Sequence, residues 1–231
     1  IEGTLNKPEG EGPFPAVVLM HGCSGLTKTA KNGMMQHSDF LVSKGFVTLV
    51  LDSFSGRGKV DEVVCFDQRE GWSALHYRQF DAFHGLLYLQ SQPFVEGENI
   101  FLMGQSHGGT VAMHASQGAA AQTFPSKPEF QGVVAYYPNC LAVPTWPQKL
   151  TSPLLVLGAA WDDWMPSARC REAKGKVQGA DFDVVIYDDA HHAFDMPISK
   201  LKFGPFTLEG NRAAAEDSRE LMSKWFRRFR Q

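Results

Sequence analysis

The sequence predicts an α/β protein in which helices cover both faces of a mostly parallel central sheet. Short, continuously apolar segments recur along the chain, which is the pattern of strands buried on both faces of a sheet. Segments with helical spacing of apolar residues separate most of these strands, as in parallel strand–helix–strand units. We expect all 231 residues (1–231) to form one domain, because this length suits a single α/β domain.

Seven segments are predicted to be strands. The first, residues 1–5, is short and is followed by a turn rich in proline and glycine. The second runs from Ala16 to Met20 and is apolar at every position. The remaining strands share an apolar or β-branched character and are expected at residues 46–51, 99–103, 132–137, 153–157 and 182–187.

Five segments have the residue spacing of helices. Gly45 follows the first as a C-cap, because glycine readily adopts the left-handed conformation in which many helices end. The last is amphipathic, with Trp225 and Phe226 on its inward face. The helices are expected at residues 34–44, 72–89, 108–117, 166–176 and 212–229. Residues 53–71 are expected to form an irregular surface excursion, and residues 139–151 a loop without a helix.

Composition excludes several classes of function. The hydrophobic share of 43% and the charged share of 20% are ordinary for a globular protein. A net charge of −3 gives no electrostatic footprint for a nucleic-acid partner. No apolar run approaches the roughly 20 residues that span a bilayer, so no membrane partner is expected. We expect a monomer or a small homo-oligomer.

The four cysteines follow no zinc-binding spacing. Two disulfides and four reduced thiols both remain open as interpretations. Cys140 and Cys170 are the preferred pair, because they follow neighbouring strands of the predicted sheet. Paired cysteines would indicate a secreted or periplasmic protein, whereas reduced cysteines would indicate a cytoplasmic one.

One short motif carries a chemical prediction. Gly104-Gln-Ser-His-Gly108 fits the pattern G-x-S-x-G, a sharp strand-to-helix turn that exposes a serine hydroxyl for attack. The pattern is weak evidence alone, but a buried strand precedes it and a helical segment follows it, as the turn requires. Ser106 is therefore the candidate nucleophile.

A base and an acid for Ser106 follow later strands. A serine hydroxyl needs a neighbouring base, which histidine supplies, and a carboxylate must orient that histidine. Asp162 follows the strand at 153–157 and His192 follows the strand at 182–187. The order serine, acid, histidine is that of the α/β-hydrolase fold, in which all three lie at the carboxyl ends of the strands.

Three motifs together resemble those of the dienelactone hydrolase family of α/β-hydrolases. They are Gly104-Gln-Ser-His-Gly-Gly109, Gly158-Ala-Ala-Trp-Asp-Asp-Trp-Met-Pro166 and Tyr187-Asp-Asp-Ala-His-His-Ala-Phe194. The resemblance runs over nearly the whole chain. The family's acid lies four residues before a proline, which implies Asp162 rather than Asp163. Its histidine lies two residues before a phenylalanine, which implies His192 rather than His191.

The resemblance also implies an oxyanion hole. The family's His-x-x-x-Gly loop corresponds to residues 21–25, which implies that the backbone N–H groups of Cys23 and His107 are the donors. The best-known members have a cysteine nucleophile where this chain has Ser106, and a glutamate in the first loop where it has Gly22. Both departures favour a serine esterase-like mechanism.

Other polar residues leave alternatives open. Arg57, Arg69 and Arg78 are candidates for binding a substrate carboxylate, as arginines do in the family. The acidic and histidine residues of 188–195 resemble a metal cluster, but hydrolysis by a serine needs no metal, so we expect no metal and no cofactor. The predicted function is hydrolysis of a small-molecule carboxylic ester or lactone. The alternatives are a non-catalytic binding protein on the same fold, and a peptidase or acyl-transfer activity.

Overall fold

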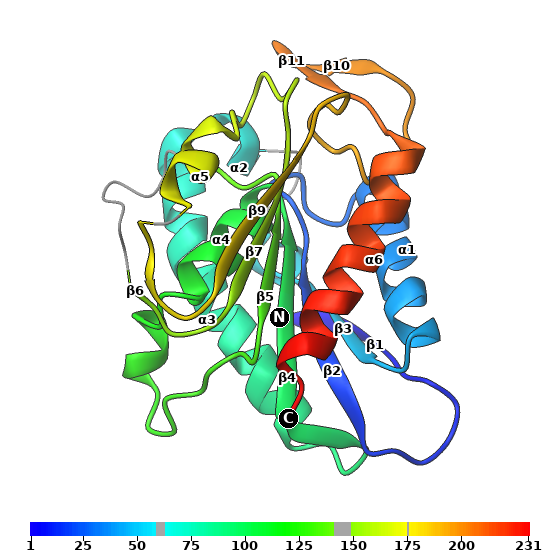
Figure 1. Cartoon of the computed structure of the whole chain (residues 1–231), viewed down its shortest axis with the longest axis vertical. Helices are drawn as coiled ribbons and strands as arrows, with labels where there is room; N and C mark the ends of the chain where they lie inside the picture. Colours follow the sequence, from blue (N-terminus) through cyan, green and yellow to red (C-terminus); the bar gives the residue numbers. More distant parts are fainter. Residues whose placement is uncertain (59–62, 141–148, 175) are drawn as a thin grey trace.

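A seven-stranded sheet forms the centre of the molecule (Figure 1). The computed structural model describes residues 1–58, 63–140, 149–174 and 176–231. Along the sheet the strand order is β1-β3-β2-β4-β5-β7-β9, and every pair is parallel except β1 with β3. The strands of this sheet are β1 (Glu2–Asn6), β2 (Phe14–Met20), β3 (Val47–Asp52), β4 (Val95–Gln105), β5 (Val133–Tyr136), β7 (Leu154–Ala159) and β9 (Phe182–Tyr187). The predicted α/β class and the mostly parallel sheet are confirmed.

Helices cover both faces of the sheet. Figure 1 shows α1 and α6 on one face and α3 and α4 on the other. The helices are α1 (Lys28–Ser43), α2 (Val63–Phe66), α3 (Gln68–Gln90), α4 (His107–Ala115), α5 (Ala168–Ala173) and α6 (Arg212–Phe229). Alternation along β2 divides the core between the two faces: Val18 and Met20 pack with the α3 and α4 side, whereas Val17 and Leu19 pack with α1 and α6.

Several predicted helix boundaries were wrong. The predicted helix at 34–44 begins earlier, at Lys28, because the Thr27 side chain accepts a hydrogen bond from the backbone of Ala30 and caps the first turn. The predicted helix at 72–89 also begins earlier, at Gln68, where Asp67 caps it in the same way. The predicted surface excursion at 53–71 therefore contains α2, a 3₁₀ turn (Ser55–Arg57) and the start of α3. Within the predicted loop at 139–151, residues 141–148 lie outside the described part of the chain.

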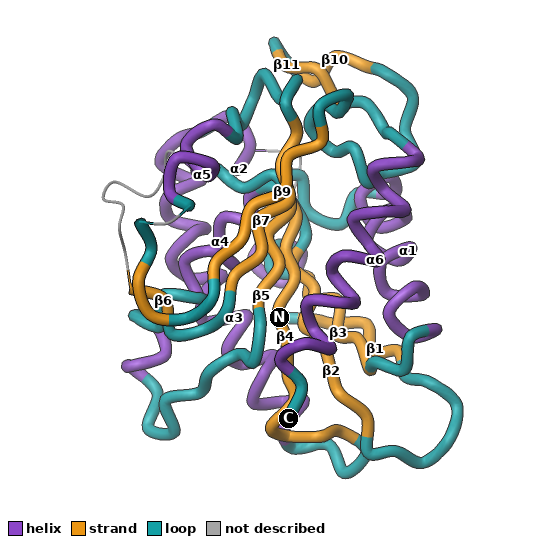
Figure 2. The backbone as a smooth tube through the Cα atoms, viewed as in Figure 1, coloured by secondary structure: helices purple, strands orange, loops and turns teal. Residues whose placement is uncertain are grey.

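A hairpin that the sequence did not reveal lies beyond the main sheet. It consists of β10 (Leu201–Phe203) and β11 (Phe206–Leu208), which pair antiparallel (Figure 2). Its strands have three residues each, too short for a periodic signal. A further pair, β6 (Lys149–Leu150) and β8 (Gln178–Gly179), is shorter still. A parallel bridge joins Leu208 to His192, so the hairpin lies against the loop that follows β9.

Two disulfides connect loops and helices around the sheet. Cys140, after β5, is bonded to Cys170 in α5, and their Cα atoms are 5.5 Å apart. Cys23, after β2, is bonded to Cys65 in α2, with a Cα separation of 5.0 Å. Within the described residues, no helix is both long and apolar enough to cross a membrane.

Candidate active site

The turn between β4 and α4 holds Ser106 in an unusual backbone conformation. Its φ of 53° and ψ of −116° are rare for a residue with a side chain, and such strain is typical of functional turns. A Cβ at Gly104 would lie 2.0 Å from the carbonyl oxygen of Gly108, and one at Gly108 would lie 2.3 Å from the carbonyl oxygen of Met20. Only glycine fits at both positions, so the motif is required by close packing of backbone on backbone.

The side chains of Ser106, His192 and Asp162 form one hydrogen-bonded chain. His192 Nε2 lies 3.0 Å from Ser106 Oγ, and His192 Nδ1 lies 2.8 Å from Asp162 Oδ2. The backbone N–H groups of Trp164 and Met165 donate to the other oxygen, Asp162 Oδ1, at 3.0 and 2.7 Å. All three side chains are buried. The structure thus brings the three predicted residues together, with the Ser106 hydroxyl beside His192 and His192 beside the Asp162 carboxylate.

Asp163 and His191, the neighbours of Asp162 and His192 in the sequence, contact the hairpin and the residues beside it. The Asp163 carboxylate accepts hydrogen bonds from the backbone N–H and the hydroxyl of Thr207, both at 2.9 Å. Although desolvation acts in the opposite direction, these hydrogen bonds and Lys202 lower the pKa of Asp163. His191 Nδ1 lies 3.0 Å from the carbonyl oxygen of Trp161, and its Nε2 lies 3.4 Å from a carboxylate oxygen of Glu209. Asp163 thus contacts β11, whereas His191 contacts Trp161 and Glu209, the residue that follows β11.

Two backbone segments border Ser106, and they carry the N–H groups predicted to form an oxyanion hole. His107 is the first residue of α4, so its N–H group has no acceptor within the helix. Cys23 follows β2 in the loop beside the serine, and a Cβ at Gly22 would lie 3.6 Å from Ser106 Cβ. These segments are the ones that supply the predicted donors.

Arg78 lies beneath this pair of segments rather than in contact with solvent. The side chain is fully buried, with one guanidinium nitrogen donating to the carbonyl oxygen of His21 and another 2.8 Å from His107 Nδ1. Because a guanidinium only donates, His107 Nδ1 accepts and its Nε2 donates to the carbonyl oxygen of Gly71 at 3.0 Å. Burial lowers the pKa of His107 and that of His21 to about 3 each, with the charge of Arg78 adding to the effect. Arg78 therefore ties together the two segments that border Ser106.

This placement corrects the expectation for the arginines. Arg78 is not available to a substrate carboxylate, because burial is complete. Arg57 forms a two-point ion pair with Asp81, at 2.7 and 2.8 Å. Arg69 is exposed in the first turn of α3. None of the three lines either cavity beside Ser106.

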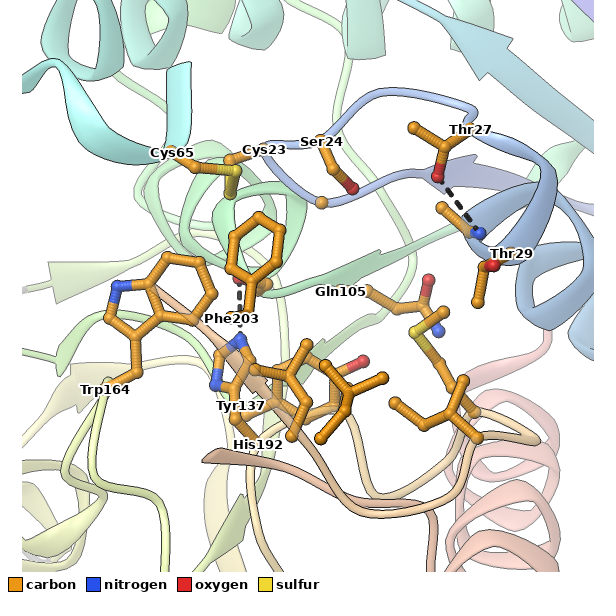
Figure 3. A pocket seen from close by; sticks show the side chains of 18 residues that line it. Cys23, Ser24, Thr27, Thr29, Cys65, Gln105, Tyr137, Trp164, His192 and Phe203 are labelled. Carbon is orange, nitrogen blue, oxygen red and sulfur yellow. Dashed lines mark hydrogen bonds between the residues drawn. A yellow bond between two sulfur atoms is a disulfide. The ribbon is translucent and has the colours of Figure 1, made fainter. Parts of the chain in front are cut away.

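Among the described residues, two cavities are found beside Ser106. The first has a volume of about 320 Å³, and Figure 3 shows His192, Tyr137, Gln105 and Phe203 around it, with the Cys23–Cys65 disulfide on its far side. The second, of about 510 Å³, lies toward α2 and the start of α3. The indole of Trp164 borders both and packs 4.9 Å from the ring of His192.

A second buried histidine–carboxylate pair, which sequence reasoning missed, lies behind the site. His37 Nε2 is 2.6 Å from Asp195 Oδ2, and Gln105 and Tyr137 also donate to the Asp195 carboxylate at 2.6 Å each. Desolvation acts in the opposite direction, but the hydrogen bonds from His37, Tyr137 and Gln105 together with the charge of His37 lower the pKa of Asp195. The sequence signals were weak: Gln105 directly precedes Ser106, and Asp195 falls in the segment 188–195 that resembled a metal cluster. Among the described residues, no group of three or more histidine, cysteine or acidic side chains is arranged to hold a metal ion.

Comparison with known proteins agrees with this architecture. A family model described as the dienelactone hydrolase family matches residues 1–230. A dienelactone hydrolase-like promiscuous phosphotriesterase from metagenomic libraries has a TM-score of 0.72 at 21% identity, covering 98% of this chain and 92% of that one. Dienelactone hydrolase from Anabaena variabilis has a TM-score of 0.69 at 19% identity, covering 99% and 92%. At such identities the likeness concerns the fold alone.

A curated relative matches only part of the chain. Human (Homo sapiens) mitochondrial acyl-coenzyme A thioesterase 2 is 29% identical over 114 residues, which are 49% of this chain and 20% of that protein. The match therefore covers about a fifth of the relative's length.

Proposed function

The chain belongs to the dienelactone hydrolase family, and from that premise we propose that it hydrolyses small-molecule carboxylic esters or lactones through an acyl-enzyme on Ser106. The observation that carries the proposal is the hydrogen-bonded chain from Ser106 Oγ through His192 to Asp162. The main sheet takes strands from β1 to β9, which supports one catalytic domain over residues 1–231.

In the first step Ser106 Oγ attacks the carbonyl carbon while His192 Nε2 takes the hydroxyl proton. The new C–O bond converts the carbonyl to a tetrahedral oxyanion, which the N–H groups of Cys23 and His107 would hold. Asp162 stabilises the imidazolium, and its own position is fixed by two backbone donors. His192 then gives its proton to the leaving oxygen as the ester C–O bond breaks.

In the second step water replaces the alcohol. His192, neutral again, removes a proton from a water molecule that attacks the acyl carbon. The second tetrahedral intermediate uses the same two donors, and its collapse breaks the bond to Ser106 Oγ. The acid is released and the serine regains its proton from His192, so no cofactor is needed to balance the reaction.

The test compares two serines of the same cavity. Ser106→Ala is expected to abolish turnover of p-nitrophenyl acetate and labelling by a fluorophosphonate probe, because the attacking oxygen is gone. Ser24→Ala removes a hydroxyl that lines the same cavity, and we expect turnover within a few-fold of the parent protein. An acyl-enzyme burst retained in Ser106→Ala would overturn the proposal. A parent protein that does not react with the probe would instead support the alternative of a non-catalytic binding protein.

A further inference from the structure

Ser106 lies where two cavities meet. Both are lined by the serine, by the Cys23–Cys65 disulfide and by Trp164, and among the described residues the rest of the lining differs between them. An ester bound at Ser106 has two substituents, the acyl chain and the alcohol, which leave the carbonyl carbon in different directions. The two cavities therefore correspond to two separate parts of one substrate.

The position of His192 decides which part of the ester enters each cavity. The leaving oxygen must lie within hydrogen-bond reach of His192 Nε2 to receive its proton. His192 lines the first cavity and not the second, which is lined instead by His107, Thr110 and Asn139. We propose, on the basis of the function proposed above, that the first cavity binds the alcohol part of the ester, that this part is apolar and uncharged, and that the acyl part enters the second cavity.

The lining of the first cavity supports an apolar alcohol. Apolar side chains from the loop after His192 and from the β10–β11 hairpin line one side of this cavity: Ala193, Met196, Ile198, Leu201, Phe203 and Leu208. The opposite side adds hydroxyl groups of Ser24, Thr27 and Thr29, and no arginine, lysine or acidic residue lines the cavity within the part of the chain that the structure describes. A charged alcohol would lose its hydration there without gaining a partner, which is strongly unfavourable.

The size of the first cavity limits the alcohol further. Its volume of about 320 Å³ is at the small end of the range of roughly 300–1,000 Å³ for small-molecule sites. A single ring or a short alkyl chain suits this space. The second cavity is larger, and it carries Asp67, Gln68 and Asn139 beside apolar residues such as Trp72 and Leu75. Among the described residues, neither cavity is lined by the lysine or arginine that a substrate carboxylate would need.

Matched esters test the assignment on the intact protein. We expect kcat/KM for hexyl acetate to exceed that for methyl acetate and for 6-acetoxyhexanoate by at least tenfold, because only hexyl fills the first cavity without bringing a charge. Moving the same chain to the acyl side, in methyl hexanoate, should give a smaller gain over methyl acetate. A larger gain for methyl hexanoate, or equal rates for hexyl acetate and 6-acetoxyhexanoate, would overturn the assignment.

A charge placed in the cavity should invert the preference. Ile198→Arg puts a guanidinium into the apolar wall, so 6-acetoxyhexanoate should become a better substrate than hexyl acetate. Leu201→Arg, on the exposed hairpin (42% exposed), makes the same change at a position that tolerates charge if Ile198→Arg does not fold. The matched control Gln68→Arg adds the charge to the second cavity and should leave the alcohol preference unchanged. An unchanged preference in Ile198→Arg and Leu201→Arg would contradict the assignment.

The fluorophosphonate probe separates the two levels of failure. A parent protein that is labelled at Ser106 but shows no preference for apolar alcohols refutes this inference and leaves the proposed function standing. A protein that is not labelled refutes the proposed function itself.

Discussion

Two buried histidine–carboxylate pairs are present among the described residues, and they differ in what the histidine contacts on its other side. Asp162 and His192 are joined at 2.8 Å, and Asp195 and His37 at 2.6 Å, and all four side chains are buried. The difference lies in the second nitrogen of each imidazole. His192 Nε2 faces the Ser106 hydroxyl at the wall of a cavity, whereas His37 Nδ1 is buried with no hydrogen-bond partner among the described residues.

The carboxylates differ in the same sense. One carboxylate oxygen of Asp162 lies beside His192, and the other accepts hydrogen bonds from two backbone N–H groups of the same loop. Asp195 joins side chains from three separate elements: His37 from α1, Gln105 from the end of β4 and Tyr137 from the end of β5. The first pair thus contacts Ser106, whereas the second connects elements around it, since the centroid of the Tyr137 ring lies 4.6 Å from that of the His192 ring. Each pair should therefore respond to mutation in its own observable.

The largest expected effect is on Asp162 and His192, the pair that we propose to be catalytic. Asp162→Asn should lower kcat by about 10⁴, because the amide orients the wrong tautomer of His192, as in the serine-protease triad. The free energy of unfolding should change little, since asparagine has nearly the same shape as aspartate. Steady-state hydrolysis of p-nitrophenyl acetate and urea unfolding measure the two. Asp163→Asn is the matched control and should retain activity within a few-fold; an equal loss there would reverse the choice of acid.

The reverse result is expected for the second pair. Asp195→Ala should lower the free energy of unfolding by about 3–5 kcal/mol, because three buried donors lose their acceptor. The pKa of Asp195 is lowered in the folded protein, so its contribution is present above the unfolded pKa near 4 and is lost as the pH falls through the folded value. The destabilisation should therefore be largest at neutral pH and shrink in acid.

Urea unfolding at several pH values checks this expectation. Tyr137→Phe, which removes only one donor to the same carboxylate, should cost about 1 kcal/mol. A loss of activity of 10⁴ in Asp195→Ala without loss of stability would show that the second pair acts in the chemistry.

The smallest expected effect concerns the histidines that contact Arg78, which belong to neither pair. Folded His21 and His107 have pKa values of about 3, below the unfolded value near 6.5, so the unfolded chain binds more protons between these pH values. Stability should fall as the pH drops through this window, by about 1.4 kcal/mol per pH unit for each histidine. His107→Gln should reduce the dependence of the unfolding free energy on pH by the contribution of one proton, about 1.4 kcal/mol per pH unit. Urea unfolding between pH 4 and 6.5 measures this dependence. An unchanged slope would mean that His107 is protonated in the folded protein.

Sequence reasoning found the parts of this protein that are encoded locally. Periodicity marked the strands of the main sheet, because a strand buried on both faces is apolar at every position, and Ala16 to Met20 is such a segment. The glycines around Ser106 marked the turn, because backbone contacts there exclude any Cβ. The resemblance to the dienelactone hydrolase family, carried by the motifs that end at Pro166 and Phe194, implied Asp162 and His192, and the structure brings both to the serine.

Tertiary structure alone decided the roles of the neighbours. Asp163 and His191 carry the same chemical groups as Asp162 and His192, and only the course of the hairpin gives them different partners. The sequence allowed Arg78 to be a substrate ligand, but in the structure this residue of α3 is fully buried and contacts His107. Such roles depend on contacts between residues far apart in the chain, whose distances are set by loop paths and helix packing. Local sequence patterns indicate the strands of the main sheet and most of the helices, whereas the partner of each buried charge is decided only when those elements pack together.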